Sequence, residues 1–566
     1  MERIARSKSE KTHLYKLSRK ENNIYIYNLN MSVINTGVGR KCCFGSTPLS
    51  GTHKTIMLVG PTGSGKTTLI NAMINYILGV KQKDPVRFEL VPKESDQSQA
   101  HSQTSEITAY QINHCKDFAI DFSLTIIDTP GFGDTRGIAK DKEIVDKVRE
   151  FFSAKDGISS IDAVGFVTQS ALVRLTPTQK YIFDSILSIF GKDIEDNIVL
   201  LATFADGQVP HVLQAIQEAK IPCARNKKGI PICLKFNNSA LFASNDEAGT
   251  GDKAGTDDEA GTDDRDEVLR FEEMFWKMGT VSIKNLFHRL NCLEAQSLQL
   301  TKEVLSERKK LETTVEGLQH IIQVGLINLD KLKKEQKALE NHRDDAEKNK
   351  NFEFEVDVPK IEKVPLQTGI HTTTCRNCNF TCHGNCVYSI DIDKSKCCAI
   401  TNGSCTNCPG KCHWSHHSNL PYKFVYSSTT ETRTYQHLKE KYEKAFGAKL
   451  SAAQVVQQLK EDYRQTQQTV FNDIKKLSDI QKRLGEIALR PNPLSATDYI
   501  DLIIESEKQE HKPGFLERIQ ELNKCREGAD LIKKVSNNEK LLPDEKEKDK
   551  DGGFRTWFGK LFGGAD

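Results

Sequence analysis

The chain lacks any long hydrophobic run and any recognisable secretion signal. None of its apolar stretches approaches the roughly 20 residues that a membrane-spanning helix needs. Its first residues, MERIARSKSEKTHLYK, are polar and basic and contain no apolar segment of the kind found in signal peptides. We therefore expect a cytoplasmic protein in a reducing compartment.

An excess of charge of one sign is also missing. The 79 Lys and Arg residues nearly balance the 77 Asp and Glu residues, which leaves a formal net charge of +2. Such a balance creates no overall attraction to nucleic acid or to anionic membranes. We expect no nucleic-acid partner, and the length of 566 residues suggests several domains rather than one core.

The first half of the chain changes character twice. Residues 1–50 form a weakly patterned N-terminal extension with one strand candidate, NIYIYNL. Over residues 51–243, apolar strands alternate with helical segments, which is typical of an α/β domain with a mainly parallel sheet and helices on both faces. Residues 244–267 repeat a unit of Ala, Gly, Thr and acidic residues with nothing apolar to bury, and we expect a disordered insert there.

Two long helical segments follow. Residues 268–350 are expected to hold the last helix of this head domain and a first coiled-coil helix, and residues 435–490 a second one. Between them, residues 351–434 contain two strand-like segments that bracket a cysteine-rich stretch. We predict an antiparallel coiled-coil hairpin with this stretch at its tip, and pairing with helices of another chain is the alternative. The apolar positions of the first helix are spaced alternately by three or four residues, with interruptions: Leu311, Val315, Leu318, Ile322, Leu329, Leu332 and Leu339.

The C-terminal part is expected to contain helices over residues 491–536, a disordered linker over 537–553 and an amphipathic tail over 554–566. A helix of about ten residues is unstable alone in water, so the tail needs a surface. A protein groove is one such surface, and peripheral binding to a membrane is the alternative. The apolar face of the tail consists of Phe554, Trp557, Phe558, Leu561 and Phe562.

The stretch GPTGSGKTT lies between an apolar strand and a helical segment. It matches the pattern G-x-x-x-x-G-K-[ST], in which a glycine-rich loop turns its backbone N–H groups toward phosphates at a helix N-terminus. Lys66 is expected to reach the β- and γ-phosphates, and Thr67 to bind Mg²⁺ through its hydroxyl. The predicted nucleotide-binding residues of this loop are Gly60, Pro61, Thr62, Gly63, Ser64, Gly65, Lys66, Thr67 and Thr68.

A second box, SLTIIDTPGFGDT, ends a predicted strand. Asp128 can hold the Mg²⁺ shell, and the amide of Gly131 can sense the γ-phosphate. A D-x-x-G box of this kind points to a GTPase more than to an ATPase. In the polar loop SQTSEIT, Thr104 is the candidate that caps Mg²⁺ in the triphosphate state, and Thr108 is the alternative.

Base recognition is expected where the strand NIVLLA ends in the segment Thr203 to Asp206. Guanine-specific proteins usually carry N-K-x-D here. Asp206 could accept hydrogen bonds from guanine N1 and N2, and Phe204 could stack on the base. In KFNNSALF, Ser239 and Ala240 could offer a backbone amide to guanine O6. Because the Lys is missing, strict selectivity for GTP over ATP stays open.

Together GPTGSGKTT, DTPGFGDT and VRLTPTQKYIFDSI are similar to motifs of the septin and immunity-associated nucleotide-binding branch of P-loop GTPases, to which the chloroplast Toc receptors are related. The resemblance covers residues 54–242. It implies dimerisation through the nucleotide faces, with a partner that can complete the site. Phe132 stands where a Ras-like enzyme has its water-positioning Gln, so the isolated domain should hydrolyse slowly. Arg136 and Arg174 are the arginines near enough in sequence to consider as an activating residue.

Nine of the 16 cysteines fall between Cys375 and Cys412. The stretches CRNCNFTCHGNC and CTNCPGKCHWSH share the pattern C-x₂-C-x₃-C-H-x₂-[C/H], and Cys397 and Cys398 lie between them. In a reducing compartment such a cluster favours metal over disulfides, and the histidines favour zinc over an iron–sulfur cluster. We predict about two structural zinc ions, with the sharing of ligands undecided. The candidate ligands are Cys375, Cys378, Cys382, His383, Cys386, Cys405, Cys408, Cys412, His413 and His416.

These observations predict a GTP-binding protein that uses Mg²⁺ and carries structural zinc. The first hypothesis is a slow GTPase regulated by dimerisation, so a homodimer or higher oligomer through the head is expected. The second is a coiled-coil scaffold that nucleotide merely stabilises, without significant hydrolysis. An ATP-driven machine of the SMC type would also have a head and a hairpin, but the sequence shows no ABC-like signature.

Overall fold

The computed structural model describes residues 14–21, 23–35, 39–46, 51–91, 106–133, 138–154, 157–243, 263–341, 353–490 and 497–510, with single positions up to 530. The chain divides into two compact units. The first unit comprises residues 1–308 and 483–526, and the second comprises residues 309–482 and 527–566. The predicted tail, the linker before it, Thr104 and Arg136 lie outside the described residues.

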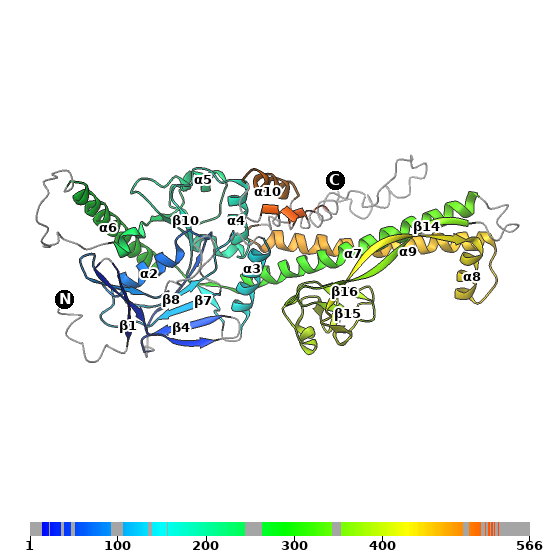
Figure 1. The fold of residues 1–566 in the computed structure, drawn as a ribbon, viewed down its shortest axis with the longest axis horizontal. Coiled ribbons are helices and arrows are strands. Elements are labelled where there is room, and N and C mark those ends of the chain that lie inside the picture. The colour runs from blue at the N-terminus through cyan, green and yellow to red at the C-terminus, as the bar shows by residue number, and fades with distance from the viewer. Residues whose placement is uncertain are drawn as a thin grey trace, which may run out of the picture. The chain divides into compact units, whose positions relative to one another are not determined.

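An eight-stranded sheet forms the centre of the first unit (Figure 1). Its five strands from β12 to β8 are parallel, β7 is antiparallel to β8, and β3 is antiparallel to β4. The mainly parallel sheet expected from the sequence is therefore confirmed. In spatial order the strands are β12 (Cys233–Lys235), β11 (Ile198–Thr203), β10 (Ala163–Gln169), β5 (His53–Val59), β8 (Ser123–Asp128), β7 (Thr108–Ile112), β4 (Arg40–Phe44) and β3 (Ser32–Asn35).

Helices pack on both faces of this sheet. On one face, α2 (Lys66–Ile77) and α6 (Asp263–Cys292) bury a common apolar cluster that includes Val167 of β10. Neighbouring strand residues point to opposite faces, and the Phe166 ring lies 4.7 Å from that of Phe183 in α4 (Pro177–Leu187) between centroids. Other described helices of the unit are α3 (Ile138–Ser153), α5 (Val212–Glu218) and α10 (Thr497–Glu510), with the short 3₁₀ helices η1 (Lys192–Asn197) and η2 (Asn238–Phe242).

The N-terminal fifty residues differ from the expected separate extension. The strands β3 and β4 join the main sheet, and β1 (Tyr15–Glu21) and β2 (Ile24–Leu29) form a second sheet with β6 (Val86–Glu89). The guanidinium of Arg19 donates two hydrogen bonds of 2.9 and 2.8 Å to the buried carboxylate of Glu89. Residues far apart in sequence thus build this part of the domain. At the expected acidic insert, α6 already begins at Asp263.

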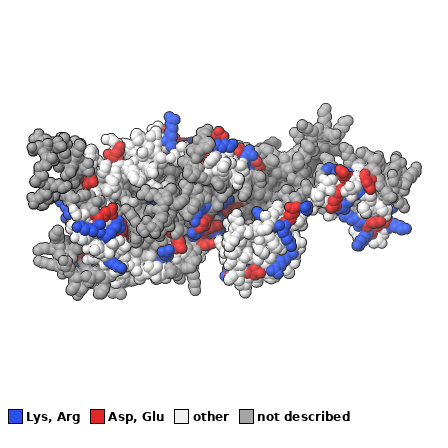
Figure 2. All heavy atoms as spheres, viewed as in Figure 1, with Lys and Arg blue, Asp and Glu red and all other residues white. Residues whose placement is uncertain are grey.

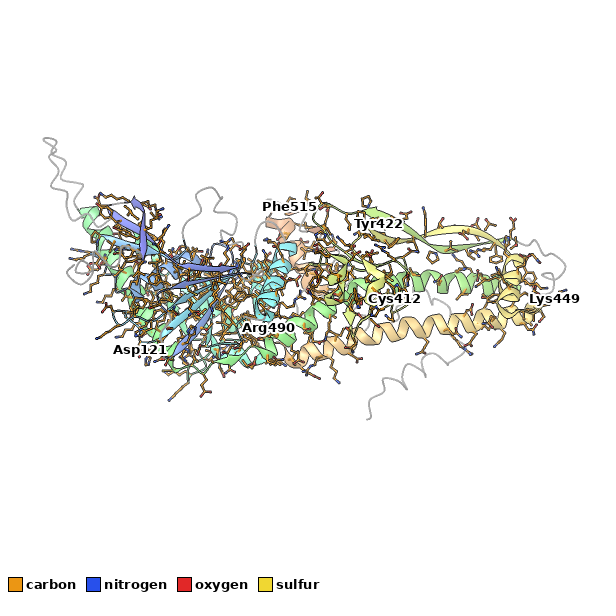
Figure 3. All side chains as sticks on the ribbon, turned by 90° about the horizontal axis from the view of Figure 1, so that it is seen from below. Asp121, Cys412, Tyr422, Lys449, Arg490 and Phe515 are labelled. Atoms are coloured by element: carbon orange, nitrogen blue, oxygen red, sulfur yellow. The ribbon has the colours of Figure 1, made fainter. Side chains whose placement is uncertain are left out.

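The second unit contains long helices and a long strand hairpin. The helix α7 (Gln299–Asn341) enters it from the first unit, α8 (Tyr435–Phe446) lies wholly within it, and α9 (Ala452–Ile487) leaves it. The strands β14 (Glu353–Pro365) and β20 (Tyr422–Thr434) pair antiparallel along their whole length. Figures 1 and 3 show α7 and α9 side by side within this unit. One apolar cluster joins the three helices through Leu332, Leu339, Leu438, Tyr442, Val455 and Leu459.

The cysteine module, defined here as residues 366–421, lies between β14 and β20. Its strands are β15 (Thr373–Cys375), β16 (Phe380–His383), β17 (Ile400–Thr401), β18 (Ser404–Cys405) and β19 (His417–Ser418), with the 3₁₀ helices η3 (Asp391–Lys396) and η4 (Trp414–His416). Elsewhere β9 (Ser160–Ile161) pairs with β13 (Gln296–Ser297).

The predicted place of this module at the tip of a hairpin is wrong. The side chain of Asn407 donates a 2.9 Å hydrogen bond to the carbonyl of Thr313, and Val324 packs against the cysteine cluster. Thr313 precedes the end of α7 by 28 residues, which is about 42 Å of helix. Because β14 and β20 run back along α7, the module returns to an earlier part of that helix, and α8 occupies the far end (Figure 1).

Lys and Arg side chains are interspersed with Asp and Glu on the face seen in Figure 2. No broad field of one sign covers the described residues on that face, in keeping with the near-zero net charge. Among the described residues, no helix combines the length and the apolarity required to cross a bilayer.

Candidate functional site

The phosphate loop, Gly60–Gly65, connects β5 to α2. Gly63 and Gly65 have φ angles of +73° and +84°, which side chains rarely tolerate, and a Cβ at Gly60 would lie 2.2 Å from the carbonyl oxygen of Val167. Among the described residues, no side chain caps the N-terminus of α2 at Gly65. The loop therefore has the backbone shape and the open helix N-terminus that suit a phosphate.

Lys66 extends over this loop. Its Nζ donates hydrogen bonds of 2.9 and 3.0 Å to the carbonyl oxygens of Gly60 and Pro61. Burial lowers the pKa of this lysine to about 8, although the negative charge of Asp128 acts in the opposite direction. A buried ammonium group gains from an arriving anion. Lys66 is thus placed to respond to a phosphate in the loop.

Two hydroxyl groups in the loop have spare hydrogen-bonding capacity. Oγ1 of Thr62 and Oγ of Ser64 are buried, and neither has a hydrogen-bond partner among the described residues. Buried polar side-chain atoms are usually paired. These hydroxyls, together with the glycine geometry, fit the chemistry of a bound nucleotide phosphate. Thr67 and Thr68, in the first turn of α2, are half-buried.

The D-T-P-G box packs directly against the phosphate loop. Asp128 is fully buried at the end of β8, and a Cβ at Gly131 would lie 2.6 Å from Oγ1 of Thr62. The amide of Thr62 donates a 2.8 Å hydrogen bond to the carbonyl of Phe132, whose own amide donates to Gly60 at 3.3 Å. The structure therefore brings together the two predicted phosphate-binding segments. Thr108, the alternative switch threonine, lies in β7 opposite Asp128.

The Phe132 side chain is fully buried. An apolar ring cannot orient a water molecule through a hydrogen bond, so this side chain does not offer the contact that a glutamine would make. Arg174 is exposed, in the segment that precedes α4.

The two segments predicted to bind the base also meet. The amide of Ala205 donates a 3.0 Å hydrogen bond to the carbonyl of Phe236, and the side chain of Asn237 donates to the carbonyl of Ala205 at 3.1 Å. The Asn237 side chain also accepts from the amide of Ser239 at 3.2 Å, at the start of the turn that contains the buried Ala240. Asp206 and Ser239 are both exposed.

Phe204 lies beside the phosphate loop. Its φ is +52°, its side chain is 58% exposed, and its ring edge would lie 3.7 Å from a Cβ at Gly65. Asp206 accepts a 2.9 Å hydrogen bond from the amide of Gln208 through Oδ1. A large exposed ring held next to a phosphate loop is well placed to stack on a base.

Sequence reasoning missed two side chains that support the loop. The hydroxyl of Thr203 donates to the carbonyl of Ser64 at 2.7 Å, and the side chain of Gln169 donates to the carbonyl of Gly63 at 3.3 Å. Both residues end parallel strands, β11 and β10. The convergence of strand ends at one edge of a parallel sheet is the signal that could have identified them.

The sulfur atoms of the cysteine module gather into three groups, and Figure 3 marks Cys412 among them. In each group the potential ligand atoms lie within 4.8 Å of one another. The groups are Cys375, Cys378, Cys408 and Cys412; Cys382, Cys405, Cys408 and His417; and His383, Cys386 and Cys397. Soft thiolate and imidazole donors at this spacing fit zinc.

Two of the ten predicted ligands are not brought to these groups. His413 and His416 are exposed, and Nδ1 of His413 lies 2.9 Å from the hydroxyl of Ser415. His417, which the repeated pattern did not include, is 1% exposed and belongs to the second group. The repeat favoured His413 and His416 because of their spacing from the cysteines. Only the path of the chain from η4 into β19 shows that His417, rather than His416, faces the cysteine sulfurs.

The sequence comparisons match the part of the chain that carries the phosphate loop and the D-T-P-G box. The septin family model matches residues 50–154. Septin-9 of rat, mouse and human is 39% identical over 80 residues, which cover 14% of this chain and only 12% of each relative.

Solved structures of Arabidopsis thaliana Toc33 also align with this chain. A complex with Mg²⁺ and GMPPNP is 16% identical over 40% of this chain and 85% of that chain, with a TM-score of 0.24. A dimerization-deficient mutant of the same protein is 15% identical over 40% of this chain and 84% of that chain, with a TM-score of 0.23. In sequence, the domain that carries the phosphate loop is similar to the GTPase domain of septins.

Proposed function

We propose that this protein binds GTP with Mg²⁺ and hydrolyses it slowly, under control of dimerisation. The main support is the contact between the phosphate loop and the D-T-P-G box, with the buried Lys66 beside both. Thr67, Thr104 and Asp128 would hold Mg²⁺, which supplies charge neutralisation at the phosphates. Phe204, Asp206, Ser239 and Ala240 would bind the guanine base.

Slow hydrolysis follows from Phe132. A buried phenyl ring cannot orient an attacking water, so this chain does not supply that function at the usual position. We infer that a second copy completes the site across the nucleotide face. Phe204 and Asp206 border this face, and both are exposed, so a second copy of the chain could contact them.

The second unit would act as a coiled-coil stalk. The described heptad positions Leu311, Leu332 and Leu339 are buried, which supports pairing of α7 within the chain. The cysteine module would bind zinc as a structural metal, because its donors are buried and a small module with little apolar surface needs metal to fold. The C-terminal tail would bind a protein or a membrane surface.

Phosphate release distinguishes this proposal from a scaffold without hydrolysis. The full chain should release phosphate from GTP over several turnovers, and the rate per chain should rise with protein concentration. The Lys66→Ala variant is the control, since it keeps the fold elements but loses the loop ammonium. Release equal to that of the variant at every concentration would favour the scaffold.

A further inference from the structure

We propose that the cysteine module holds three zinc ions, two of them bridged by the thiolate of Cys408 and the third bound separately. This inference rests on the proposal that the module binds zinc, and it specifies the number of ions and the ligands of each. The repeated C-x₂-C pattern suggests one ion per repeat. The structure instead interleaves the repeats.

The bridged pair follows from the shared membership of Cys408. Its sulfur belongs both to the group with Cys375, Cys378 and Cys412 and to the group with Cys382, Cys405 and His417. Tetrahedral zinc with Zn–S bonds of about 2.3 Å requires S···S separations of about 3.8 Å. The sulfurs of Cys378 and Cys412 are 3.6 Å apart. One thiolate common to two tetrahedra gives each ion four ligands.

His417 completes the second ion of the pair. Its Nδ1 lies 3.1 Å from the carbonyl oxygen of His413, which fixes the ring and leaves Nε2 as the ligand atom. Nε2 is buried and has no hydrogen-bond partner among the described residues. A buried ring nitrogen without a partner beside three sulfurs indicates a metal there.

Backbone amides support the sulfurs of this pair. The amides of Asn407 and Cys408 donate to the sulfur of Cys405 at 3.3 and 3.4 Å, and the amide of Cys412 donates to the sulfur of Cys408 at 3.3 Å. Hydrogen bonds of this kind stabilise thiolates and orient them as ligands. A Cβ at Gly410 would lie 3.0 Å from the sulfurs of both Cys378 and Cys412, so a larger residue there would crowd two ligands of the first ion.

The third ion would be held by the group of His383, Cys386 and Cys397, with Cys398, whose sulfur lies outside that group, moving in as the fourth ligand. Nδ1 of His383 lies 3.3 Å from the sulfur of Cys397 and 3.6 Å from that of Cys398. Tetrahedral zinc with ordinary bond lengths requires an N···S separation of about 3.6 Å. The hydroxyl of Thr373 lies 3.2 Å from the sulfurs of both Cys386 and Cys397.

The ligands account for the whole cluster. Three tetrahedral ions need twelve coordination positions. The nine cysteines between Cys375 and Cys412, with His383 and His417, provide eleven ligands, and the bridge counts twice. Every cysteine of the cluster is then used. Cys398 also lies 3.2 Å from the hydroxyl of Thr313, so the third ion is linked to α7.

Zinc counting on the full chain, purified under reducing conditions, tests the inference. We expect three zinc ions per chain in the wild type, about two in Cys386→Ala and about one in Cys408→Ala, because losing the bridge leaves two ions with three ligands each. His417→Ala should lose zinc, whereas the matched control His416→Ala should keep three. Two ions in the wild type would refute the three-ion cluster while leaving zinc binding intact. A chain without metal would refute zinc binding itself.

A spectroscopic measurement on the wild type covers the case in which a variant does not fold. In the cobalt-substituted chain, a bridging thiolate couples two of the three cobalt spins. The electron paramagnetic resonance signal should then correspond to about one isolated cobalt per three bound. A signal from three isolated cobalt ions would exclude the bridge through Cys408.

Discussion

The phosphate loop and the cysteine module would hold a charged ligand in opposite ways. The loop would use backbone N–H groups and one lysine from a short continuous segment, and its glycines create the shape that this requires. The module would use side-chain donors from segments up to about forty residues apart, between Cys375 and His417.

This difference determines how each region responds to change. The loop is supported by a sheet whose core is buried without any ligand, so losing nucleotide should leave the first unit folded. The core of the module consists largely of the candidate ligands themselves, because six of the nine buried residues in its apolar cluster are cysteines that belong to the three groups. Losing metal should therefore remove the fold of the module.

Removing zinc should have the largest effect. A structural zinc ion contributes on the order of 10 kcal/mol of folding free energy. We expect a strong chelator under reducing conditions to unfold the cysteine module, measured as rapid proteolysis between β14 and β20. GTP affinity of the same sample should change less than about twofold, because the core of the first unit is made by other residues. A module that stays protease-resistant after complete zinc loss would show that metal does not hold it together.

Gly60→Ala should disable the nucleotide site and leave the module unaffected. The added Cβ would meet the carbonyl of Val167 at 2.2 Å, so the loop backbone must shift. The shifted backbone would no longer hold the charged phosphates. We therefore expect GTP affinity to fall by roughly 100-fold or more, an effect as large as the loss of a buried charged contact. Isothermal titration would measure this.

Gly279→Ala is the matched control for that variant. A Cβ at Gly279, in α6, would meet no atom of the described residues within 4 Å. This substitution should keep GTP affinity and raise stability by up to about 1 kcal/mol. Equal affinities of the two variants would disprove the role of the loop geometry.

Asp206→Asn should change base preference. The carboxylate of Asp206 would accept hydrogen bonds from guanine N1 and N2. The side-chain amide of asparagine would match the base edge of xanthine better. Hydrogen bonds to a charged group contribute about 1.5–3 kcal/mol, so GTP affinity should drop by roughly 10- to 100-fold while xanthosine triphosphate binds better. Competition binding would measure both. Equal affinity of the wild type for ATP and GTP would contradict the assignment of Asp206.

The smallest expected effect is on pH dependence. The pKa of Lys66 is about 8 in the nucleotide-free chain, because burial lowers it. Bound phosphates raise this pKa, so binding is strongest below pH 8 and weakens as pH rises from 8, by at most about tenfold per unit. Affinities between pH 7 and 9 should show this fall in the wild type. The Lys66→Ala variant should bind GTP weakly, and its affinity should not fall over this pH range. If the affinity of both proteins fell equally with pH, Lys66 would not be the cause of the pH dependence.

Local motifs could be predicted from the sequence and long-range pairings could not. Gly60 to Thr68 all lie in one loop and the first turn of one helix, so their spacing in the sequence is enough to predict the phosphate loop. The segments that hold Asp206 and Ser239 meet through Ala205 and Asn237, because parallel strands end at a common edge, which the strand pattern also indicates. By contrast, nothing in the sequence shows that β4 pairs with β7, or that β14 and β20 return the cysteine module to Thr313.

The cysteine and histidine side chains of the module illustrate the limit most clearly. Identical spacing in two repeats suggests two equivalent sites, yet Cys375 and Cys378 of the first repeat lie with Cys408 and Cys412 of the second. Only the packing of β15 between β16 and β19 brings these segments together. The choice of His417 over His416 likewise depends on which residue the turn of η4 directs inward.

Native mass spectrometry of the full chain, with a non-hydrolysable GTP analogue or with GDP, tests the central claim most directly. This measurement gives the number of bound nucleotides, the number of zinc ions and the number of chains in the assembly at once. The account predicts one nucleotide and three zinc ions per chain, and a dimer with the GTP analogue that dissociates with GDP. A monomer in both nucleotide states, or chains that bind no nucleotide while carrying zinc, would contradict it.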